Sequence, residues 1–468
     1  DLHDLYRSRS GSSHLCPIYQ RSGRSSVALM HRTLLSACAQ RPKVVILGTG
    51  WSSFRVLSDI DASKFSVSVV SPRNHLLFTP MLASSAVGTV NQRSICQPVR
   101  PVCAAKGARF YESQVCAIDK RQRQVTCRTA SGKEFNLDYD KLVIGVGHQP
   151  NDFGIEGVKE HALFMKETAD ATVLKRQILA KLEEASYFHA LDSDMTLTSK
   201  EEEIRRILTF VIVGGGPTGV ELAGELTDFL QQEGRQLYRH VIQYAKVHML
   251  TYDLLSMLEK DLQAYACQHL AKRQSVHLTL NALVQKVDKD VLKLKIGEET
   301  TTIRYGTLVW CAGVKAHPFV RDLGLKLNKA GSLILVDDRM RVLGEDGIHA
   351  IGDCAAIEGI PLPQTAQVAN QEAVYLAKFL NEGSPEDAKP FKFKPLGTMA
   401  YLGGQTAIMS SLPVVRRITG FFAYVGWRSV YWSMQMSLRN MYMLSTDWTR
   451  TLIFGRDLTR FGAASRPE

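Results

Sequence analysis

Three glycines near the middle of the chain have the spacing of a phosphate-binding turn. Gly214, Gly216 and Gly219 follow the pattern G-x-G-x-x-G, directly after the apolar run 210–213 and before a segment with helical apolar spacing. The first glycine permits a tight turn, the second lets backbone approach a pyrophosphate, and the third lets helix and strand pack closely. The helix N-terminus then offers free N–H groups to an anion. We therefore expect a dinucleotide here, the alternative being a glycine-rich turn without a ligand.

A second loop of the same kind lies nearer the start of the chain. Gly48 and Gly50 follow an apolar run, and Ser53 stands where a third glycine is expected. Serine is small enough to keep a helix close to its strand. The next predicted strand ends in Ser71 rather than in an acidic residue, which leaves ribose binding there open. We expect the loop that begins at Arg73 to lie against a flat ring.

Two later apolar strands end in glycine, and a third ends in Gly-Asp. The strands before Gly147 and Gly313 suit crossovers between two domains. The segment 347–354 places Asp353 at the end of an apolar strand. A carboxylate there can accept hydrogen bonds from the hydroxyls of a cofactor. It can also cap a helix N-terminus, and the two roles can hold together.

This arrangement of loops and strands resembles the flavoproteins that contain two dinucleotide-binding domains. Stretches within 71–95, 364–378 and 427–457, together with both loops, closely resemble type II NADH:quinone oxidoreductases, the alternative NADH dehydrogenases of respiratory membranes. The resemblance extends from about residue 43 to about residue 460. It implies an α/β fold of two Rossmann-like domains, an FAD domain with an inserted NAD(P)H domain, followed by C-terminal membrane-associated helices.

The resemblance also assigns ligands to the two loops. Non-covalent FAD is expected at the first loop and NADH, or NADPH, at the second, with a quinone as acceptor. The residues expected at FAD are Gly48, Gly50, Ser53, Ser71, Arg73, Gly147 and Asp353. Those expected at NAD(P)H are Gly214, Gly216, Gly219, Thr251 and Gly313. The sequence contains no Cys/His cluster with metal-ligand spacing, so no metal is expected.

The implied reaction is hydride transfer from NADH to FAD, followed by transfer of two electrons to a quinone without proton pumping. The resemblance places Glu221 beside the nicotinamide and flavin, and Gln367, Asn370 and Gln371 near the flavin edge and the quinone head. Near the start of a helix, however, the Glu221 carboxylate can instead stabilise the helix N-terminus. Polar residues such as Gln367 on a domain-interface helix can likewise only cap loops. Glu225, one turn further on, is expected to be structural.

Two positions depart from the family pattern. Relatives usually carry an acidic residue that holds the ribose where this chain has Thr251, so NADPH is an alternative donor. Relatives often carry histidine where this chain has Asn370, which can hydrogen-bond a quinone but cannot relay a proton near neutral pH. Two other functions therefore stay open. One is a weakly active or inactive flavoprotein subunit of a larger respiratory complex. The other is sulfide:quinone reductase, which needs cysteines such as Cys311 or Cys354 at the flavin.

The composition fits two or three domains with a sizeable core. The chain has 468 residues and a formal net charge of +11, and no long basic run with aromatics, so nucleic acid is not an expected partner. Nine scattered cysteines without a C-x-x-C pair suit a reducing compartment. We expect a basic arm or transit remnant at 1–42, the FAD domain at 43–165 and 316–385, the NAD(P)H domain at 166–315, and a membrane-anchoring region at 386–468.

Both ends of the chain bear on location. The first 42 residues are rich in arginine and serine and poor in acidic residues, which is typical of a mitochondrial transit peptide, the alternative being a flexible basic arm. Near the C-terminus, one apolar helix face is predicted from Trp427, Tyr431, Met434, Leu438, Met441 and Tyr442. With eight arginines and three acidic residues from Arg416 onward, this region suits a membrane interface. The alternative is packing on the core or on a second subunit.

These features predict a peripheral protein of the mitochondrial inner membrane. No run of 18 or more truly apolar residues occurs, so no membrane span is predicted. The expected partners are the lipid surface, a quinone, and either a second copy of the chain or respiratory complexes.

Overall fold

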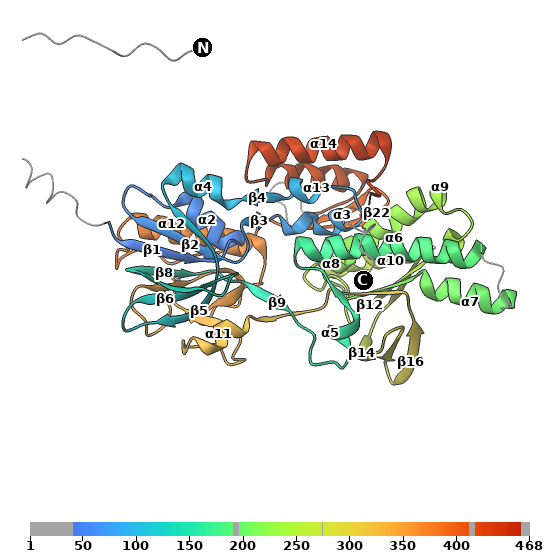
Figure 1. Cartoon of the computed structure of the whole chain (residues 1–468), viewed down its shortest axis with the longest axis horizontal. Helices are drawn as coiled ribbons and strands as arrows, with labels where there is room; N and C mark the ends of the chain where they lie inside the picture. The colour runs from blue at the N-terminus through green and yellow to red at the C-terminus, as the bar shows by residue number, and fades with distance from the viewer. Residues whose placement is uncertain (1–40, 191–195, 274, 411–416, 460–468) are drawn as a thin grey trace, which may run out of the picture. The chain divides into compact units, whose positions relative to one another are not determined.

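The computed structural model describes residues 41–190, 196–273, 275–410 and 417–459. The expected N-terminal arm lies outside the described residues, apart from its last two positions. From Lys43 onward the chain forms one unit, which contains one mixed and one parallel sheet, each at the centre of a domain, and a C-terminal region (Figure 1).

Seven strands form the sheet of the first domain, in the spatial order β20 (Ile348–Ala350), β8 (Lys141–Ile144), β1 (Lys43–Leu47), β2 (Ser66–Ser71), β5 (Arg109–Asp119), β6 (Gln124–Thr129) and β7 (Glu134–Asp138). The first five run parallel, and the last three form an antiparallel meander. Helices α2 (Trp51–Asp59) and α12 (Ala366–Asn381) pack against each other beside it. Residues 44–47 of β1 are all buried, as expected for a parallel strand with both faces covered.

Smaller elements complete the first domain. They are β3 (His75–Leu77), α3 (Leu82–Ala86), β4 (Cys96–Pro98), α4 (Val99–Lys106), α11 (Pro318–Asp322), β19 (Ile334–Val336) and β21 (Ala355–Ile357).

Five parallel strands form the sheet of the second domain, in the order β10 (Leu163–Phe164), β17 (Thr307–Trp310), β11 (Thr209–Val213), β12 (Lys246–Leu250) and β13 (Val276–Thr279). An antiparallel sheet follows, made of β14 (Ala282–Val287), β15 (Val291–Ile296) and β16 (Glu299–Arg304). The helices of this domain are α5 (Val158–His161), α6 (Thr168–Ala190), α7 (Leu197–Ile207), α8 (Pro217–Phe229), α9 (Arg235–Leu237) and α10 (Lys260–Lys272). All five residues of β11 are buried.

Two short antiparallel strands, β9 (His148–Pro150) and β18 (Val314–Ala316), carry the chain between the domains. They directly follow Gly147 and Gly313, where crossovers were predicted. The predicted domain boundary after residue 165 lies too far along the chain, because β10 pairs with β17 of the second sheet and Val158 belongs to the core of the second domain.

The C-terminal region begins with a three-stranded sheet and ends with two helices. Its elements are β22 (Thr398–Gly403), β23 (Thr406–Ser410), β24 (Arg417–Gly420), α13 (Phe421–Ser433) and α14 (Leu438–Phe454). β22 packs along α8 of the second domain (Figure 1). Helix α13 packs on β23. The region therefore covers one side of the helix that follows the second glycine loop.

The single apolar face predicted for this region is wrong. Trp427 and Tyr431 are buried at 2% and 8% exposure, whereas Leu438 and Tyr442 are 84% and 74% exposed. The reason is that the segment forms two helices with a break between 433 and 438, so the 3.6-residue spacing does not continue across it. Within the described ranges, no helix is both long enough and apolar enough to cross a membrane.

Candidate functional site

The first glycine loop joins β1 to α2 at the carboxyl edge of the first sheet. Gly48 has φ +101°, and a Cβ there would collide with the carbonyl oxygen of Gly145. A Cβ on Gly50 would meet only Arg73 Nη2, at 3.8 Å, so this edge is open to a phosphate. Ser53 donates its hydroxyl toward the carbonyl oxygen of Gly145 at 3.2 Å, which ties the loop to the end of β8. These residues fit the pyrophosphate of FAD.

Ser71 and Arg73 lie at and after the end of β2. Ser71 is buried, and its hydroxyl lies 3.1 Å from Thr49 Oγ1 and accepts the main-chain N–H of Arg73 at 3.1 Å. These bonds show Ser71 shaping the loop, and its contact with FAD stays a prediction. Arg73 lies beside Gly50, and its Nη1 is 2.8 Å from each carboxylate oxygen of Glu167. A cation is thus held at the open glycine edge.

Three polar side chains form a chain of contacts at the crossover. Asp353, in the turn after β20, has Oδ2 at 2.6 Å from Nδ1 of His148. The other ring nitrogen of His148, Nε2, lies 2.9 Å from Lys166 Nζ. A lysine ammonium only donates, so Nε2 of His148 accepts from Lys166. Asp353 Oδ1 accepts no hydrogen bond within the described residues, so it can take a cofactor hydroxyl. Neither His148 nor Lys166 carries a motif by which the sequence alone would find it.

A cavity of about 570 Å³ lies beside this turn, and its walls include Gly352, Asp353 and Glu372. This volume is within the usual range for a site that binds a small molecule. Glu372 is buried, and its Oε2 accepts the main-chain N–H of Gly352 at 2.6 Å. Burial raises the pKa of Glu372 to about 7. Sequence reasoning missed this carboxylate, although it directly follows Gln371.

The second glycine loop joins β11 to α8 and has the predicted geometry of a phosphate-binding turn. Gly214 has φ +121°, and a Cβ there would lie 2.7 Å from the main chain of Cys311. A Cβ on Gly219 would collide with the carbonyl oxygen of Gly214. Gly216, which caps the N-terminus of α8, has no atom within 4 Å of such a Cβ. This edge is therefore free to receive a second dinucleotide.

Two residues flank that edge. Thr251 follows β12, is buried, and donates its hydroxyl to the carbonyl oxygen of Asp253 at 2.8 Å. Asp253, the acidic residue of this turn, accepts the N–H of Leu254 at 2.9 Å. Gly313, with φ +66°, lies three residues after β17, and the ring of Phe153 covers it so closely that a Cβ would collide with the ring. The structure thus places Thr251 against Gly215 of the loop, without a carboxylate at the end of β12, and the contact of Gly313 with a dinucleotide stays a prediction.

Glu221 lies near the start of α8 and is 5% exposed. Its Oε1 accepts the main-chain N–H of Tyr401 at 3.3 Å and the indole N–H of Trp427 at 3.2 Å. Burial raises the pKa of Glu221 to about 8, while these two hydrogen bonds act to lower it. It is the fifth residue of α8, beyond the first turn, so the alternative role at the helix N-terminus is not supported. Oε2 accepts no hydrogen bond within the described residues.

The predicted glutamines lie on one face of α12 and hold a neighbouring backbone segment. Gln367 donates to the carbonyl oxygen of Gly397 at 3.2 Å and accepts the N–H of Leu396 at 3.0 Å. Gln371 donates to Lys394 O at 2.9 Å and accepts Lys394 N–H at 3.0 Å. Both glutamines thus hold the backbone of this segment, and their expected catalytic role stays a prediction. The observed spacing is i, i+4, which places both on one face.

Asn370 lies on α12 between the two glutamines. Its Oδ1 is buried and has no hydrogen-bond partner in the part of the chain that the structure describes. A buried polar atom without a protein partner is a place for a ligand or a water molecule. Asn370 therefore remains the candidate of this helix for contact with a quinone.

The two cysteines considered for sulfide chemistry lie in different domains. Burial raises the pKa of both Cys311 and Cys354 to about 12, so neither is a thiolate at neutral pH. Cys354 also donates to the carbonyl oxygen of Ile351 at 3.4 Å inside the first domain. This arrangement does not support sulfide oxidation.

Two open glycine edges, on two parallel sheets joined by crossover strands, define a flavin oxidoreductase with two dinucleotide-binding domains. The chain belongs to the pyridine nucleotide-disulphide oxidoreductases, whose family model matches residues 42–373, and within them to the type II NADH dehydrogenases, because the NDH2 C-terminal domain matches residues 396–457.

Related proteins match over most of their length. The mitochondrial internal alternative NAD(P)H-ubiquinone oxidoreductase A1 of Solanum tuberosum is 38% identical over 453 residues, covering 90% of this chain and 88% of the relative. The mitochondrial external NADH-ubiquinone oxidoreductase 2 of Saccharomyces cerevisiae is 34% identical over 461 residues, covering 89% and 82%. The structure of NDH2 from Plasmodium falciparum in complex with NADH has a TM-score of 0.82 and 23% identity, covering 90% of this chain and 100% of that one, which shows the shared fold.

Proposed function

We propose that this protein is a peripheral flavoprotein of the mitochondrial inner membrane that transfers a hydride from NADH to FAD and two electrons onward to a quinone, without pumping protons. The observation that carries the proposal is the pair of open edges at Gly50 and Gly216, each at the carboxyl end of a parallel sheet. Each receives one dinucleotide, so one chain holds both the electron donor and the flavin. The names of relatives similar over nearly their whole length support the donor, the acceptor and the location.

FAD, when bound, supplies the redox chemistry, since it accepts a hydride and passes on two electrons. The chain supplies position. Gly50 and Arg73 would hold the pyrophosphate of FAD, and Asp353, which lies 2.6 Å from His148 Nδ1, would accept a hydroxyl of the cofactor. Gly216 and the N-terminus of α8 would hold the pyrophosphate of NADH.

Quinol formation consumes two electrons and two protons, whereas a hydride brings two electrons and one proton. A further proton must therefore come from the protein or from solvent. Glu221 is the group to which we assign this proton, at Oε2, because Oε1 is engaged by Tyr401 and Trp427. Burial raises its pKa to about 8, which keeps it protonated at neutral pH. The amide N–H groups of Asn370 would donate to a quinone carbonyl, and its unpartnered Oδ1 would accept a quinol hydroxyl.

The exposed side of α13 and α14 is suited to bind a lipid membrane. Exposure is 56–84% for Phe421, Phe422, Leu438, Leu452, Ile453 and Phe454. So many large apolar side chains on two adjacent helices, in a region rich in arginine, suit an interfacial rather than a spanning arrangement. Association with a second copy of the chain or with respiratory complexes stays a prediction.

Rapid mixing of the purified flavoprotein with separate donors tests the proposal. NADH should bleach the flavin absorbance band at about 450 nm, and a short-chain quinone should restore it. Bleaching by sulfide alone would replace the proposal with sulfide oxidation. No bleaching by NADH, NADPH or sulfide would leave a subunit without electron transfer.

A further inference from the structure

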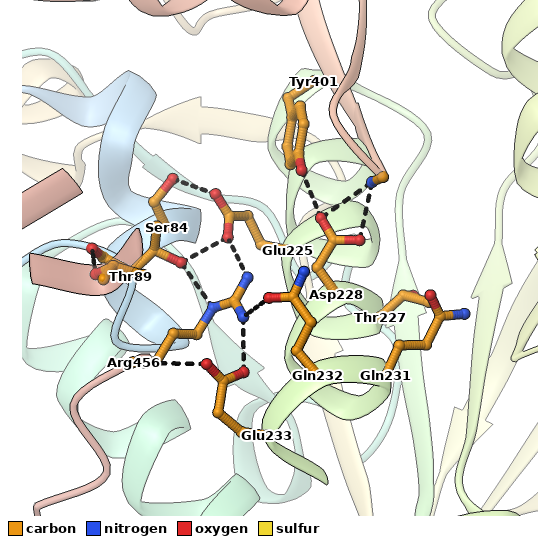
Figure 2. Close-up of polar contacts among 12 residues, drawn as sticks. Ser84, Thr89, Glu225, Thr227, Asp228, Gln231, Gln232, Glu233, Tyr401 and Arg456 are labelled. Atoms are coloured by element: carbon orange, nitrogen blue, oxygen red, sulfur yellow. Dashed lines mark hydrogen bonds and ion pairs between the residues drawn. The ribbon is translucent and has the colours of Figure 1, made fainter. Parts of the chain in front are cut away.

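One face of α8 carries three buried carboxylates, Glu221, Glu225 and Asp228, at 5%, 5% and 4% exposure. Each is met by the C-terminal region. Glu225 accepts hydrogen bonds from Ser84 and Thr89 and faces Arg456, and Asp228 is contacted by the β22–β23 hairpin (Figure 2). Buried carboxylates require such partners because burial without them is costly. The spacing of three and four residues puts all three on one side of the helix.

Asp228 has an unusually complete set of partners. Its Oδ2 accepts the Tyr401 hydroxyl at 2.5 Å, and its two oxygens lie 2.9 and 3.1 Å from the main-chain N of Gly404 (Figure 2). Arg273, at the end of α10, donates from Nη2 to Oδ1 at 2.5 Å. The Asp228 and Arg273 side chains are 5% and 9% exposed. The two charges therefore neutralise each other where water is excluded.

The turn between β22 and β23 packs directly against the ion pair of Asp228 and Arg273. Gly403 and Gly404 have φ +85° and +62°, and a Cβ on either would lie within 2.8 Å of Arg273 Nη1. Only glycine meets both conditions, a left-handed backbone and a guanidinium in contact. His269 Nε2 also lies 3.2 Å from the carbonyl oxygen of Gly403. We call Asp228, Arg273, Tyr401, Gly403 and Gly404 the hairpin latch.

Tyr401 connects the latch to Glu221. Its hydroxyl donates to Asp228, and its main-chain N–H donates to Glu221. Both carboxylates are on α8, and Glu221 comes seven residues before Asp228. Two turns of α-helix separate these carboxylates, about 10 Å along the axis, so the tyrosine lies along α8. Its ring stacks on Trp427 with centroids 5.2 Å apart, and Trp427 is the second donor to Glu221. Both donors to Glu221 thus depend on where Tyr401 sits.

We propose that Asp228, neutralised by Arg273, is a positioning residue of the quinone half-reaction: it holds Tyr401 and Gly404 so that the donors from Tyr401 and Trp427 stay on the Glu221 carboxyl group. The proposal rests on the proton-holding role proposed for Glu221. Asp228 lies two turns from that group and acts through Tyr401 and Gly404, without touching Glu221.

The pH dependence of flavin reoxidation distinguishes a positioning role of Asp228 from a role in the stability of the fold alone. The titratable groups facing Glu221 are Glu225 on its own helix, Tyr401 on β22 and Tyr431 on α13. Burial raises the pKa of Tyr431 well above 10, and burial with Asp228 nearby also raises that of Tyr401, so both stay neutral. A loosened donor stabilises the Glu221 carboxylate less, which moves its pKa further upward.

The test is Tyr401→Phe, which removes only the hydroxyl that binds Asp228. Its matched control is Tyr305→Phe, which removes a buried tyrosine hydroxyl that donates to Asp288 O at 2.5 Å elsewhere in the second domain. Rapid mixing measures the rate at which a soluble short-chain quinone reoxidises the reduced flavin, from pH 6 to 10. The two single variants are measured first, and then each of them combined with Glu221→Gln. A second comparison uses Asp228→Asn and, as its control, Glu203→Gln. Each substitution removes the carboxylate charge from an ion pair with an arginine, Arg273 in the first case and Arg206 in the second.

An acid with a higher pKa gives up its proton less readily, so Tyr401→Phe should slow reoxidation at pH 7 about threefold. It should also move the alkaline limb of the profile up by about 0.5 to 1 pH unit. Tyr305→Phe should leave the profile in place, and in the Glu221→Gln background the shift should vanish. The proposal is overturned if Tyr401→Phe and Asp228→Asn follow their controls while Glu221→Gln alone changes the profile. If Glu221→Gln itself leaves the profile unchanged, the role of Glu221 fails, and the latch proposal with it.

Discussion

Trp427 on α13 donates its indole N–H to Oε1 of Glu221 on α8 at 3.2 Å, although 206 positions separate them in sequence. The same oxygen accepts the main-chain N–H of Tyr401. The C-terminal region is therefore part of the candidate active site and not only a surface attachment. For this reason, point variants test the region better than its deletion, which would remove both partners of a buried carboxyl group.

Replacing Glu221 with glutamine should change how stability depends on pH. Burial raises the pKa of Glu221 from an ordinary 4.5 to about 8 in the folded protein. Between these values the folded state keeps a proton that the unfolded state releases, so this group lowers stability as pH rises from 5 to 8. The unfolding free energy of the Glu221→Gln variant minus that of the native protein should therefore be higher at pH 8 than at pH 5, by on the order of 3 kcal/mol. Urea titrations at both pH values measure it; a difference independent of pH would contradict a buried, protonated Glu221.

Replacing Gln371 with alanine should loosen the backbone segment at Lys394 without slowing hydride transfer. The side chain makes two hydrogen bonds to that residue, each worth about 0.5–1.5 kcal/mol. We expect a loss of about 1–2 kcal/mol in unfolding free energy, with the rate of flavin reduction by NADH unchanged. Val374→Ala, at an exposed position of the same helix, is the control. A selective fall in the rate of flavin reduction would support the catalytic role that the sequence predicts for Gln371.

Introducing glutamate at Thr251 should strengthen the preference for NADH over NADPH. A carboxylate at the end of β12 can accept the ribose hydroxyls and repels a 2′-phosphate. We expect the ratio of kcat/KM for the two donors to shift about tenfold or more toward NADH, which corresponds to about 1.4 kcal/mol. Thr251→Ser, which keeps the hydroxyl bond to Asp253, should leave the ratio unchanged. Equal effects of the two substitutions would show that the site does not read the 2′ position.

Exchanging Leu452 and Phe454 for serine should weaken binding to lipid vesicles and leave NADH oxidation with a soluble acceptor intact. These side chains are 83% and 81% exposed at the end of α14, so their burial in lipid is worth about 2 kcal/mol each. Flotation with vesicles containing anionic lipid measures the loss. Leu197→Ser, at an 82% exposed position on α7, should float as the native protein does. Unchanged flotation of the double variant, with a loss of self-association, would assign this surface to a second copy of the chain.

The parts of the site that follow from local backbone rules were predictable. Gly48 and Gly214 need positive φ, and Gly219 needs the absence of a Cβ, so their spacing alone predicts the turns and the strands and helices around them. Gly147 and Gly313 mark the crossovers for a similar reason, because both take positive φ where the chain leaves a sheet. These requirements involve a few neighbouring residues, and the sequence contains them.

The direction and partners of side chains were not predictable in the same way. A helical spacing shows that Gln367 and Gln371 can share a face, but not that a segment more than twenty residues later occupies it. The predicted apolar face failed because the break after Ser433 rotates α14 relative to α13.

The sequence by itself determined two dinucleotide loops, their order in the chain, and the family to which the chain belongs, since each depends on short motifs with strict backbone demands. Only the tertiary structure decided what each polar side chain contacts. It joined Asp353 to His148 and Lys166, Asp228 to Arg273 and the β22–β23 hairpin, and Glu221 to Tyr401 and Trp427. The physical reason is that a buried polar group takes its partner from whatever packs against it, and here those neighbours come from distant parts of the chain.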